Sequence, residues 1–213
     1  MKFYWIKTNW LIKKIFVNYT WDVSKTENTV YLTFDDGPIP EITTWVLDEL
    51  KKYGFKATFF CMGENIERNP NIFKKIIFEG HSVGNHTFKH LNGWKTNTED
   101  YIDNVIKCEE EIEKGIDYKL SSKIFRPPYG KLKTAQSKAI QKLGYTIIMW
   151  DVLSADFDTT ISKETCLNNV LSTIKPGSII VFHDSLKASK NLKYALPKTL
   201  FYLKENNVNC GVL

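Results

Sequence analysis

Two adjacent carboxylates, Asp35 and Asp36, stand directly after a short apolar run over residues 29–34. The β-branched and aromatic residues of that run are typical of a buried strand, and Gly37-Pro38 then turns the chain away. Adjacent carboxylates repel each other, so a bound cation or a shared proton is what makes such a pair useful in one site. The alternative interpretation is a turn with two hydrated aspartates.

Histidines supply the remaining ligands that a metal site would need. His86 and His90 are four residues apart, so one helical turn or a tight loop brings both imidazoles to one side, and Thr87 between them can fix the loop by hydrogen bonding. Two histidines and one carboxylate suit a catalytic divalent metal that keeps an open position for water, and Asp36 is the natural third ligand. The alternative for an isolated His-x-x-x-His is a pair of solvent-exposed histidines.

The elements that would position these side chains alternate along the chain. Short apolar segments typical of strands are separated by helical patterns, of which the clearest spans residues 98–114. No Gly-x-Gly-x-x-Gly loop follows the first strand, and the alternation is even, which favours a barrel over an open sheet. We therefore expect an α/β fold, a (β/α) barrel of about seven parallel strands with outer helices. The predicted strands are residues 29–34, 57–62, 81–84, 123–125, 145–150, 178–182 and 208–213.

Polar side chains collect where the predicted strands end. The active site of a (β/α) barrel lies at the carboxyl ends of its strands. Besides the two aspartates after the first strand, such positions hold residues 85–90, residues 126–130, Asp151 and His183. Polar residues spread at random would not gather at one kind of boundary, so we expect a single site at this end of the barrel.

Four motifs follow one another in the order of a known family. They are Thr-Phe-Asp-Asp-Gly-Pro over residues 33–38, His-Thr-x-x-His over 86–90, Arg-x-Pro-Tyr-Gly over 126–130 and a late His-Asp at 183–184. From about residue 29 to its last residue the sequence resembles the polysaccharide deacetylase family, also called the NodB-homology domain or carbohydrate esterase family four. The resemblance implies a distorted (β/α) barrel and metal-dependent hydrolysis of N-acetyl or O-acetyl groups on sugars.

The resemblance also implies a role for each matching residue. Asp36, His86 and His90 would hold one divalent ion, usually zinc, with cobalt, nickel or manganese as alternatives. Asp35 would be the general base and His183 the general acid. The other implied roles are orientation of Asp35 by Arg126, oxyanion binding by the backbone N–H of Tyr129, and sugar contact by Tyr129, Pro128 and Phe157.

One stretch departs from the family pattern. The family has an Asp, a second Asp three residues later and then a Trp, and its first Asp pairs with the acid histidine. Here Leu153 stands at the first position, and Phe157 replaces the Trp. Either Asp151 or Asp156 could pair with His183 instead, and the spacing leaves that choice open.

Composition excludes several other classes of protein. The net charge of +5, from 29 basic and 24 acidic residues, is mild, and the chain has no nucleic-acid motif, so no nucleic-acid partner is expected. The four cysteines have no Cys-x-x-Cys spacing, which favours buried thiols in a reducing compartment over a disulfide framework. No stretch approaches the ~20 apolar residues of a membrane span.

Residues 1–28 form an aromatic N-terminal segment ahead of the predicted catalytic domain, residues 29–213. The segment has lysines and aromatic rings but neither the apolar core nor the cleavage site of an export signal, so we predict a cytoplasmic enzyme. We expect the rings to pack on the domain and cover one end of it. The alternative is that residues 1–21 make peripheral contact with the inner membrane face, where lipid-linked sugars are built.

The predicted function is a metal-dependent hydrolase that removes acetyl groups, most readily N-acetyl, from an amino-sugar-containing glycan or glycan precursor. Its expected partner is therefore an acetylated glycan or a lipid-linked sugar. Two alternatives stay open. One is a catalytically weak carbohydrate-binding relative, for which Leu153 is the support. The other is an O-acetyl esterase or another amide hydrolase on the same scaffold.

Overall fold

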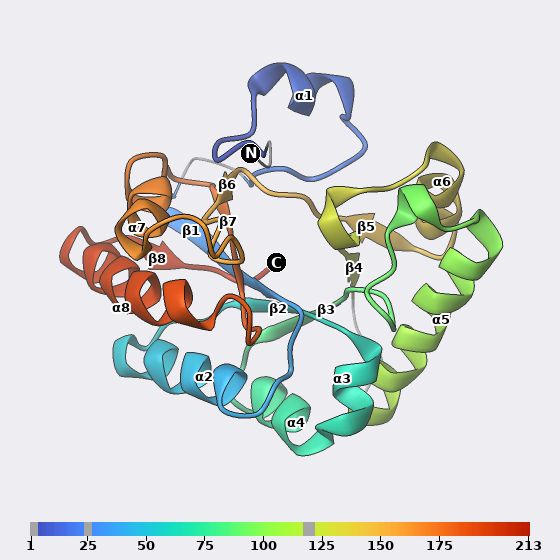
Figure 1. The fold of residues 1–213 in the computed structure, drawn as a ribbon, viewed down its shortest axis with the longest axis horizontal. Helices are drawn as coiled ribbons and strands as arrows, with labels where there is room; N and C mark the ends of the chain where they lie inside the picture. The colour runs from blue at the N-terminus through green and yellow to red at the C-terminus, as the bar shows by residue number, and fades with distance from the viewer. Residues whose placement is uncertain (1–3, 24–26, 117–121) are drawn as a thin grey trace.

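The structure is a computed structural model that describes residues 4–23, 27–116 and 122–213. Its strands form one curved sheet in the order β5-β4-β3-β2-β1-β7-β6, and β8 pairs with β1 (Figure 1). All these pairings are parallel, so the predicted barrel is confirmed, as a half-barrel. The strands are β1 (Thr29–Asp35), β2 (Thr58–Cys61), β3 (Ser82–Asn85), β4 (Lys123–Phe125), β5 (Tyr145–Ile147), β6 (Val152–Leu153), β7 (Ile179–His183) and β8 (Asn209–Cys210).

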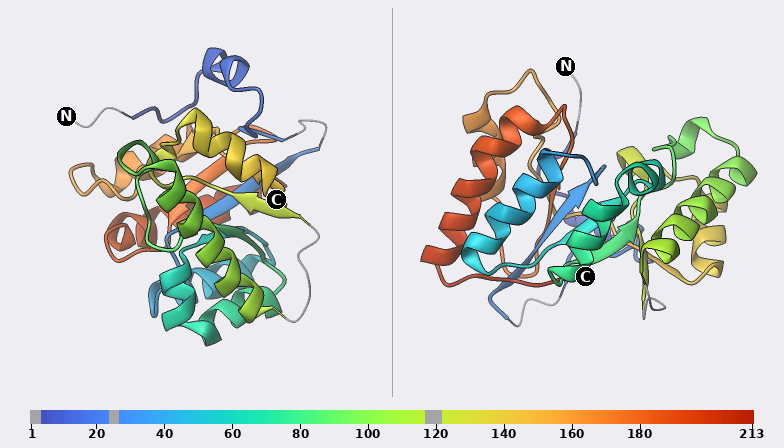
Figure 2. Two further views of the ribbon diagram at one scale, coloured as in Figure 1. Left: turned by 90° about the vertical axis from the view of Figure 1, so that its right-hand side faces the viewer. Right: turned by 90° about the horizontal axis from the view of Figure 1, so that it is seen from below.

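Helices surround the sheet on its outer side, except α1, which lies over its open side (Figure 1 and Figure 2). They are α1 (Trp10–Ile15), α2 (Ile42–Tyr53), α3 (Gly63–Arg68), α4 (Pro70–Phe78), α5 (Thr98–Gly115), α6 (Thr134–Lys142), α7 (Lys163–Leu171) and α8 (Ser189–Glu205), with 3₁₀ turns η1 (Gly93–Lys95) and η2 (Pro128–Gly130). Local signals set their ends. The Asn97 side chain accepts the Asp100 N–H in the first turn of α5, and Gly54, in the left-handed region with φ of 68°, ends α2.

Two apolar layers hold the barrel together. Between the sheet and the helices, Phe34 stacks on Phe59 and on Phe182 with ring centroids 5.1 and 6.0 Å apart. Inside the curve of the sheet, Phe60 and Ile179 belong to a smaller buried cluster. Each of these fully buried side chains contributes about 1.5–3 kcal/mol to folding, so together they fix the curvature that brings the strand ends to one side.

Two of the predicted strands are much shorter in the structure. The strand expected over residues 145–150 ends at Ile147, because the chain beyond it pairs with the N-terminal segment: the Met149 N–H donates to the Thr20 carbonyl at 2.7 Å. The strand expected over residues 208–213 shortens to β8, since only its first residues reach the start of β1. The short β6 and α1 were not predicted.

The N-terminal segment lies along the open side of the half-barrel, between β5 and β6, with α1 outermost (Figure 1). Lys7 and Lys13 form ion pairs with Asp151, and Trp21 is buried. The described part of the segment therefore packs on the domain, and it covers the gap in the wall of the barrel rather than one end. Residues 1–3 and 24–26 of the segment lie outside the described residues.

The four cysteines are free, and three of them, Cys61, Cys108 and Cys166, are buried, as expected of thiols that pack. Within the described ranges, no helix has both the length and the apolar character needed to cross a membrane.

Candidate active site

The carboxyl ends of the strands lie level with one another, which brings the predicted residues together. Asp35 of β1 stands opposite His183 of β7, and Asn85 of β3 stands opposite Phe125 of β4. The residues at and after these strand ends line one cleft of about 520 Å³. Its lining includes Asp35, Asp36, His86, His90, Tyr129, Phe157 and His183.

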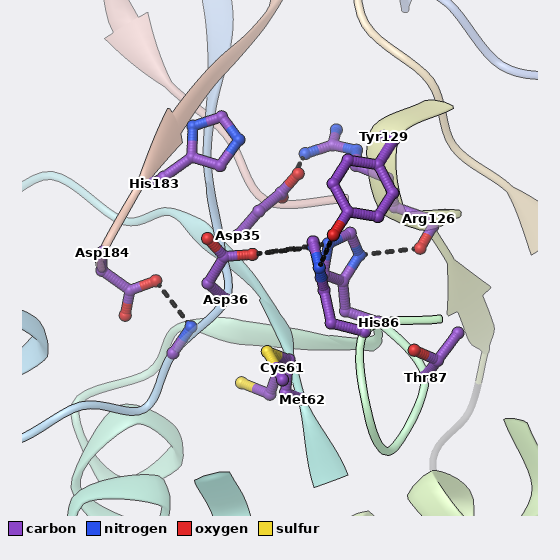
Figure 3. Close-up of polar contacts among 12 residues, drawn as sticks. Asp35, Asp36, Cys61, Met62, His86, Thr87, Arg126, Tyr129, His183 and Asp184 are labelled. Atoms are coloured by element: carbon purple, nitrogen blue, oxygen red, sulfur yellow. Dashed lines mark hydrogen bonds and ion pairs between the residues drawn. The ribbon is translucent and has the colours of Figure 1, made fainter. Parts of the chain in front are cut away.

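Arg126 is fully buried and holds Asp35 in the cleft (Figure 3). Its Nη1 donates to Asp35 Oδ1 and to Thr33 Oγ1, both at 2.7 Å, and its Nη2 donates to the Met149 carbonyl at 2.9 Å. The guanidinium also lies 4.0 Å from the centre of the Phe60 ring. A cation fixed by this many contacts leaves the Asp35 carboxylate little freedom to turn, which is the orienting role predicted for Arg126.

Asp36, His86 and His90 bring three ligand atoms to one point of the cleft. Asp36 Oδ1 lies 3.2 Å from His90 Nε2 and 3.7 Å from His86 Nε2, and the three ligand atoms lie within 4.8 Å of one another. Nitrogen and oxygen ligands on a tetrahedral zinc stand roughly 3.4 Å apart, so this spacing fits such an ion. The buried Asp36 Oδ1 accepts no hydrogen bond within the described part of the chain, which also fits an oxygen that binds a cation.

The contacts of the two imidazoles leave the Nε2 atoms available to a metal. His86 Nδ1 lies 2.7 Å from the carbonyl oxygen of Arg126 and must donate to it, so the His86 lone pair is on Nε2, facing Asp36 (Figure 3). Burial lowers the pKa of His86 to about 4, so the ring is neutral near pH 7. His90 Nδ1 lies 3.1 Å from the Tyr129 hydroxyl.

The charge on Asp36 is favoured by its surroundings. Burial opposes that charge, but contact with His90 and the charge of His183 hold the pKa of Asp36 well below its usual range. Asp36 is therefore an ionised ligand across the physiological pH range.

Left-handed backbone conformations orient this part of the site. Asp36, Thr87 and His90 have φ values of 87°, 64° and 54°, a region that non-glycine residues occupy at a cost and mainly at functional sites. Residues 86–90 are thus a tight loop rather than a helical turn. Thr87 fixes it, as predicted, since its Oγ1 accepts the Leu91 N–H at 3.3 Å.

Asp184 supports the turn that follows Asp36. Its buried carboxyl group accepts the Gly37 N–H at 3.0 Å and the Thr43 hydroxyl at 2.5 Å. Burial raises the pKa of Asp184 to about 8. A Cβ on Gly37 would lie 1.9 Å from Asp184 Oδ2, so only glycine fits here. The sequence analysis gave Asp184 no task of its own.

His183 pairs with Asp156, which answers the question raised by Leu153. His183 Nδ1 lies 2.7 Å from Asp156 Oδ1, and the His183 backbone N–H donates to Asp156 Oδ2 at 2.7 Å. Burial works against a charge on His183, but the attraction and hydrogen bond of Asp156 outweigh it and raise the pKa of His183 to about 9. Asp151 has a different task, because it binds Lys7 and Lys13 of the N-terminal segment.

The residues predicted to contact sugar are only partly where they were expected. Tyr129 is 60% exposed at the rim of the cleft, and the Phe157 ring meets His183 edge-on with centroids 5.0 Å apart. Pro128 is a correction: it is buried at the start of η2, and Pro127 lines the cleft in its place. The chain turns sharply at this point, because Tyr129 has a left-handed backbone with φ of 61°.

Tyr4 is a cleft residue that the sequence analysis missed. Its ring meets Phe157 with centroids 5.6 Å apart, and its hydroxyl donates to Asp158 Oδ2 at 2.8 Å. Tyr4 and Asp158 are 154 positions apart, and no local sequence pattern predicts such a contact. Trp150, Leu153 and Val181 give the same cleft an apolar wall.

Comparison with known proteins agrees with this geometry. Residues 22–148 match the family model described as polysaccharide deacetylase. A peptidoglycan-N-acetylglucosamine deacetylase of Bacillus cereus is 40% identical over 181 residues, which are 85% of this chain but only 64% of that protein. A second protein of that name and organism is 34% identical over 187 residues, 87% of this chain and 86% of that protein.

A solved structure shares the whole architecture. The crystal structure of the Bc1960 peptidoglycan N-acetylglucosamine deacetylase, in complex with 4-naphthalen-1-yl-N-oxidanyl-benzamide, has a TM-score of 0.87 to this chain at 36% identity. The match covers 97% of this chain and 95% of that one. Given the family model, the curated relatives and this fold, the chain belongs to the polysaccharide deacetylase family.

Proposed function

We propose that the protein is a metal-dependent deacetylase that hydrolyses the N-acetyl group of N-acetylglucosamine units in a glycan. The observation that carries the proposal is the joint presence, in one cleft, of a three-ligand cluster, a carboxylate held by Arg126 and a histidine held by Asp156. The names of the similar enzymes support the substrate class.

The cleft residues divide the chemistry of amide hydrolysis among themselves. A divalent ion held by Asp36, His86 and His90 supplies, when bound, Lewis-acid polarisation of the amide carbonyl and of the attacking water. Asp35 accepts the proton of that water as the oxygen–carbon bond forms, and Arg126 keeps the carboxylate turned towards it.

The other residues act on the carbonyl oxygen and the leaving nitrogen. The backbone N–H of Tyr129 donates a hydrogen bond to the oxyanion. As the carbon–nitrogen bond breaks, His183 gives its proton to the amine, and its raised pKa keeps it protonated near pH 7. The apolar wall of the cleft receives the methyl group of the acetyl.

A catalytically weak binding protein is the second candidate, and it loses its support in this structure. That reading depended on Leu153 leaving the acid histidine without a carboxylate, whereas Asp156 pairs with His183. The deciding experiment is acetate release from N-acetylglucosamine oligomers by protein loaded in turn with zinc, cobalt, nickel or manganese. No acetate with any of the four metals would refute the proposal.

The bond that is cleaved can be tested on the same samples. We expect hydrolysis of N-acetylated oligomers to exceed that of O-acetylated sugars of the same length, because His183 is placed to protonate an amine that leaves poorly by itself. A panel of paired amide and ester substrates measures the ratio of the two hydrolysis rates. Faster ester hydrolysis at every length would assign the protein to O-acetyl esters instead.

We also propose that α1 makes peripheral contact with an anionic membrane. Helix α1 has no buried residue: its inner side carries Ile12 and Lys13, which face the domain, while Lys14 lies exposed beside the Trp10 ring. The apolar residues of its outer side and following turn are 45–73% exposed, namely Trp10, Leu11, Ile15, Phe16 and Val17. Exposed apolar side chains next to lysines are typical of helices that lie on membranes. Lys2 and Phe3, included in the sequence hypothesis, lie outside the described residues.

Vesicle sedimentation tests this contact. We expect binding to phosphatidylglycerol vesicles that weakens with salt, and loss of binding in a Leu11→Ser/Ile15→Ser/Val17→Ser variant. Phe78→Ser is the matched control, because Phe78 is 91% exposed on α4. Equal sedimentation of the triple variant and the control would refute the proposal. The cytoplasmic location stays a prediction from the sequence.

A further inference from the structure

A second groove adjoins the catalytic cleft and has a different character. It has a volume of about 330 Å³ and shares five residues with the cleft, so the two form one continuous surface. The shared residues are Tyr4, Tyr129, Gly130, Trp150 and Leu153. None of the metal ligands and neither of the proton-transfer residues lines the second groove.

Aromatic rings from three separate parts of the chain meet in this groove. Trp5 from the N-terminal segment is 45% exposed, Trp94 from η1 is 61% exposed and Tyr129 from η2 is 60% exposed. Large rings left this open to water lose the stabilisation that burial would give them. Single exposed rings scattered over a surface need no explanation, but several rings in one groove indicate a binding site for a ligand with apolar faces.

The groove is built rigidly. The Trp94 Nε1–H points to the Leu132 carbonyl at 3.4 Å, and Lys131 Nζ lies 5.1 Å from the centre of the Trp94 ring. A Cβ on Gly130 would lie 2.6 Å from the Trp150 ring, so glycine lets the η2 loop pack closely on that indole.

The wall that carries Trp5 is also held firmly. In the three residues that follow Trp5, the Ile6 carbonyl accepts the Leu153 N–H at 2.8 Å and the Thr8 N–H donates to the Asp151 carbonyl at 2.9 Å. The ion pair of Lys7 with Asp151 adds a third tie between these two stretches. Rigid aromatic walls bind with little loss of side-chain entropy, as a preformed ligand site requires.

We propose that this groove is a saccharide subsite, in which Trp5 and Trp94 hold further sugar units of the glycan whose neighbouring unit is deacetylated. The inference rests on the proposed function for the identity of the ligand. A pyranose ring has a flat face of C–H groups that packs on an indole, and its hydroxyls stay available to water and to Lys131, which also lines the groove. Continuity with the cleft lets one oligosaccharide occupy both places.

The inference predicts that affinity depends on chain length. Binding is measured by calorimetry with N-acetylglucosamine oligomers of two to six units, in an Asp35→Asn background so that the ligand is not consumed. We expect longer oligomers to bind more tightly than the disaccharide. Trp5→Ala and Trp94→Ala should each weaken binding of the longer oligomers by about 3- to 10-fold and leave the disaccharide unchanged. Trp10→Ala is the matched control, since Trp10 is 64% exposed and does not line the groove.

The possible results separate this inference from the proposed function. Length-dependent binding that needs Trp5 and Trp94 supports the subsite, whether or not the parent enzyme releases acetate. Acetate release with length-independent binding refutes the subsite and leaves the deacetylase proposal intact. If the two tryptophan variants lose the same affinity for oligomers of every length, the rings have a structural role and the subsite is also refuted.

Discussion

Asp156 holds both the ring and the main chain of His183. Its Oδ1 lies 2.7 Å from His183 Nδ1, and its Oδ2 accepts the His183 backbone N–H at 2.7 Å. Asp156 is itself fully buried, and the Asn191 side chain donates to its carbonyl at 3.2 Å. The acid histidine is thus positioned by one carboxylate in a fixed place, although Leu153 occupies the position where the family has its pairing Asp.

The first prediction concerns the pH dependence of activity. Replacing Asp156 by Asn removes the charge that raises the pKa of His183 to about 9, so that pKa should fall towards about 6.5. Since the acid must be protonated, the alkaline limb of kcat/KM should move to lower pH. A pH profile on a soluble oligomer measures the shift, with Asp103→Asn, an exposed aspartate of α5, as the control. An unchanged alkaline limb would contradict this role.

The second prediction concerns stability and follows from the same pair. His183 has a folded-state pKa above its unfolded value, so its charge stabilises the fold fully below about pH 6.5. That contribution is lost as the pH rises through about 9. The free energy of unfolding of the metal-free protein, measured in urea between pH 6 and 10, should therefore decline with rising pH. The decline should be smaller in Asp156→Asn. Parallel curves for the two proteins would count against the pairing.

The third prediction concerns the metal. His86→Ala should abolish stoichiometric binding of a divalent ion and lower activity by at least about 100-fold, because two ligands do not complete the site. Elemental analysis after dialysis reports metal content, and circular dichroism reports the fold. His81→Ala is the matched control: His81 Nδ1 accepts the Ala57 N–H at 3.2 Å, outside the cluster. Full metal occupancy in His86→Ala would show that the ligand set is wrong.

The fourth prediction separates proton transfer from metal binding. Asp35→Asn should keep the metal, since Asp35 is not one of the clustered ligands, yet lose about 10²- to 10⁴-fold in turnover because an amide cannot accept the proton. Acetate release and metal content are measured on one preparation. Asp48→Asn, an exposed aspartate of α2, is the control. Near-normal turnover in Asp35→Asn would remove the base role.

The fifth prediction concerns the buried ion pair. Arg126→Met leaves the Asp35 carboxylate buried without its partner, which should destabilise the fold by about 3–5 kcal/mol. Adding Asp35→Asn should restore part of that loss, because the unpaired charge is then gone. Urea unfolding of the two variants gives the comparison. A double variant no more stable than Arg126→Met would mean that lost packing, rather than the charge, accounts for the effect.

The sequence alone determined the barrel and most of the site. Alternating apolar strands and helical patterns are local signals, and they predicted the parallel architecture. The motif residues Asp35, Asp36, His86 and Arg126 were found because each ends a strand or directly follows one, so that the strand's place in the sheet also places the side chain.

Only the tertiary structure decided the contacts between distant segments. The choice of Asp156 over Asp151 for His183 depends on how the chain turns after β6, and Lys7 and Lys13 engage Asp151 from the other end of the sequence. Tyr4 and Trp5 reach the cleft and its neighbouring groove because the N-terminal segment covers the gap between β5 and β6. Such contacts have no local pattern, since they arise from the way a half-barrel leaves one side open for another part of the chain to fill.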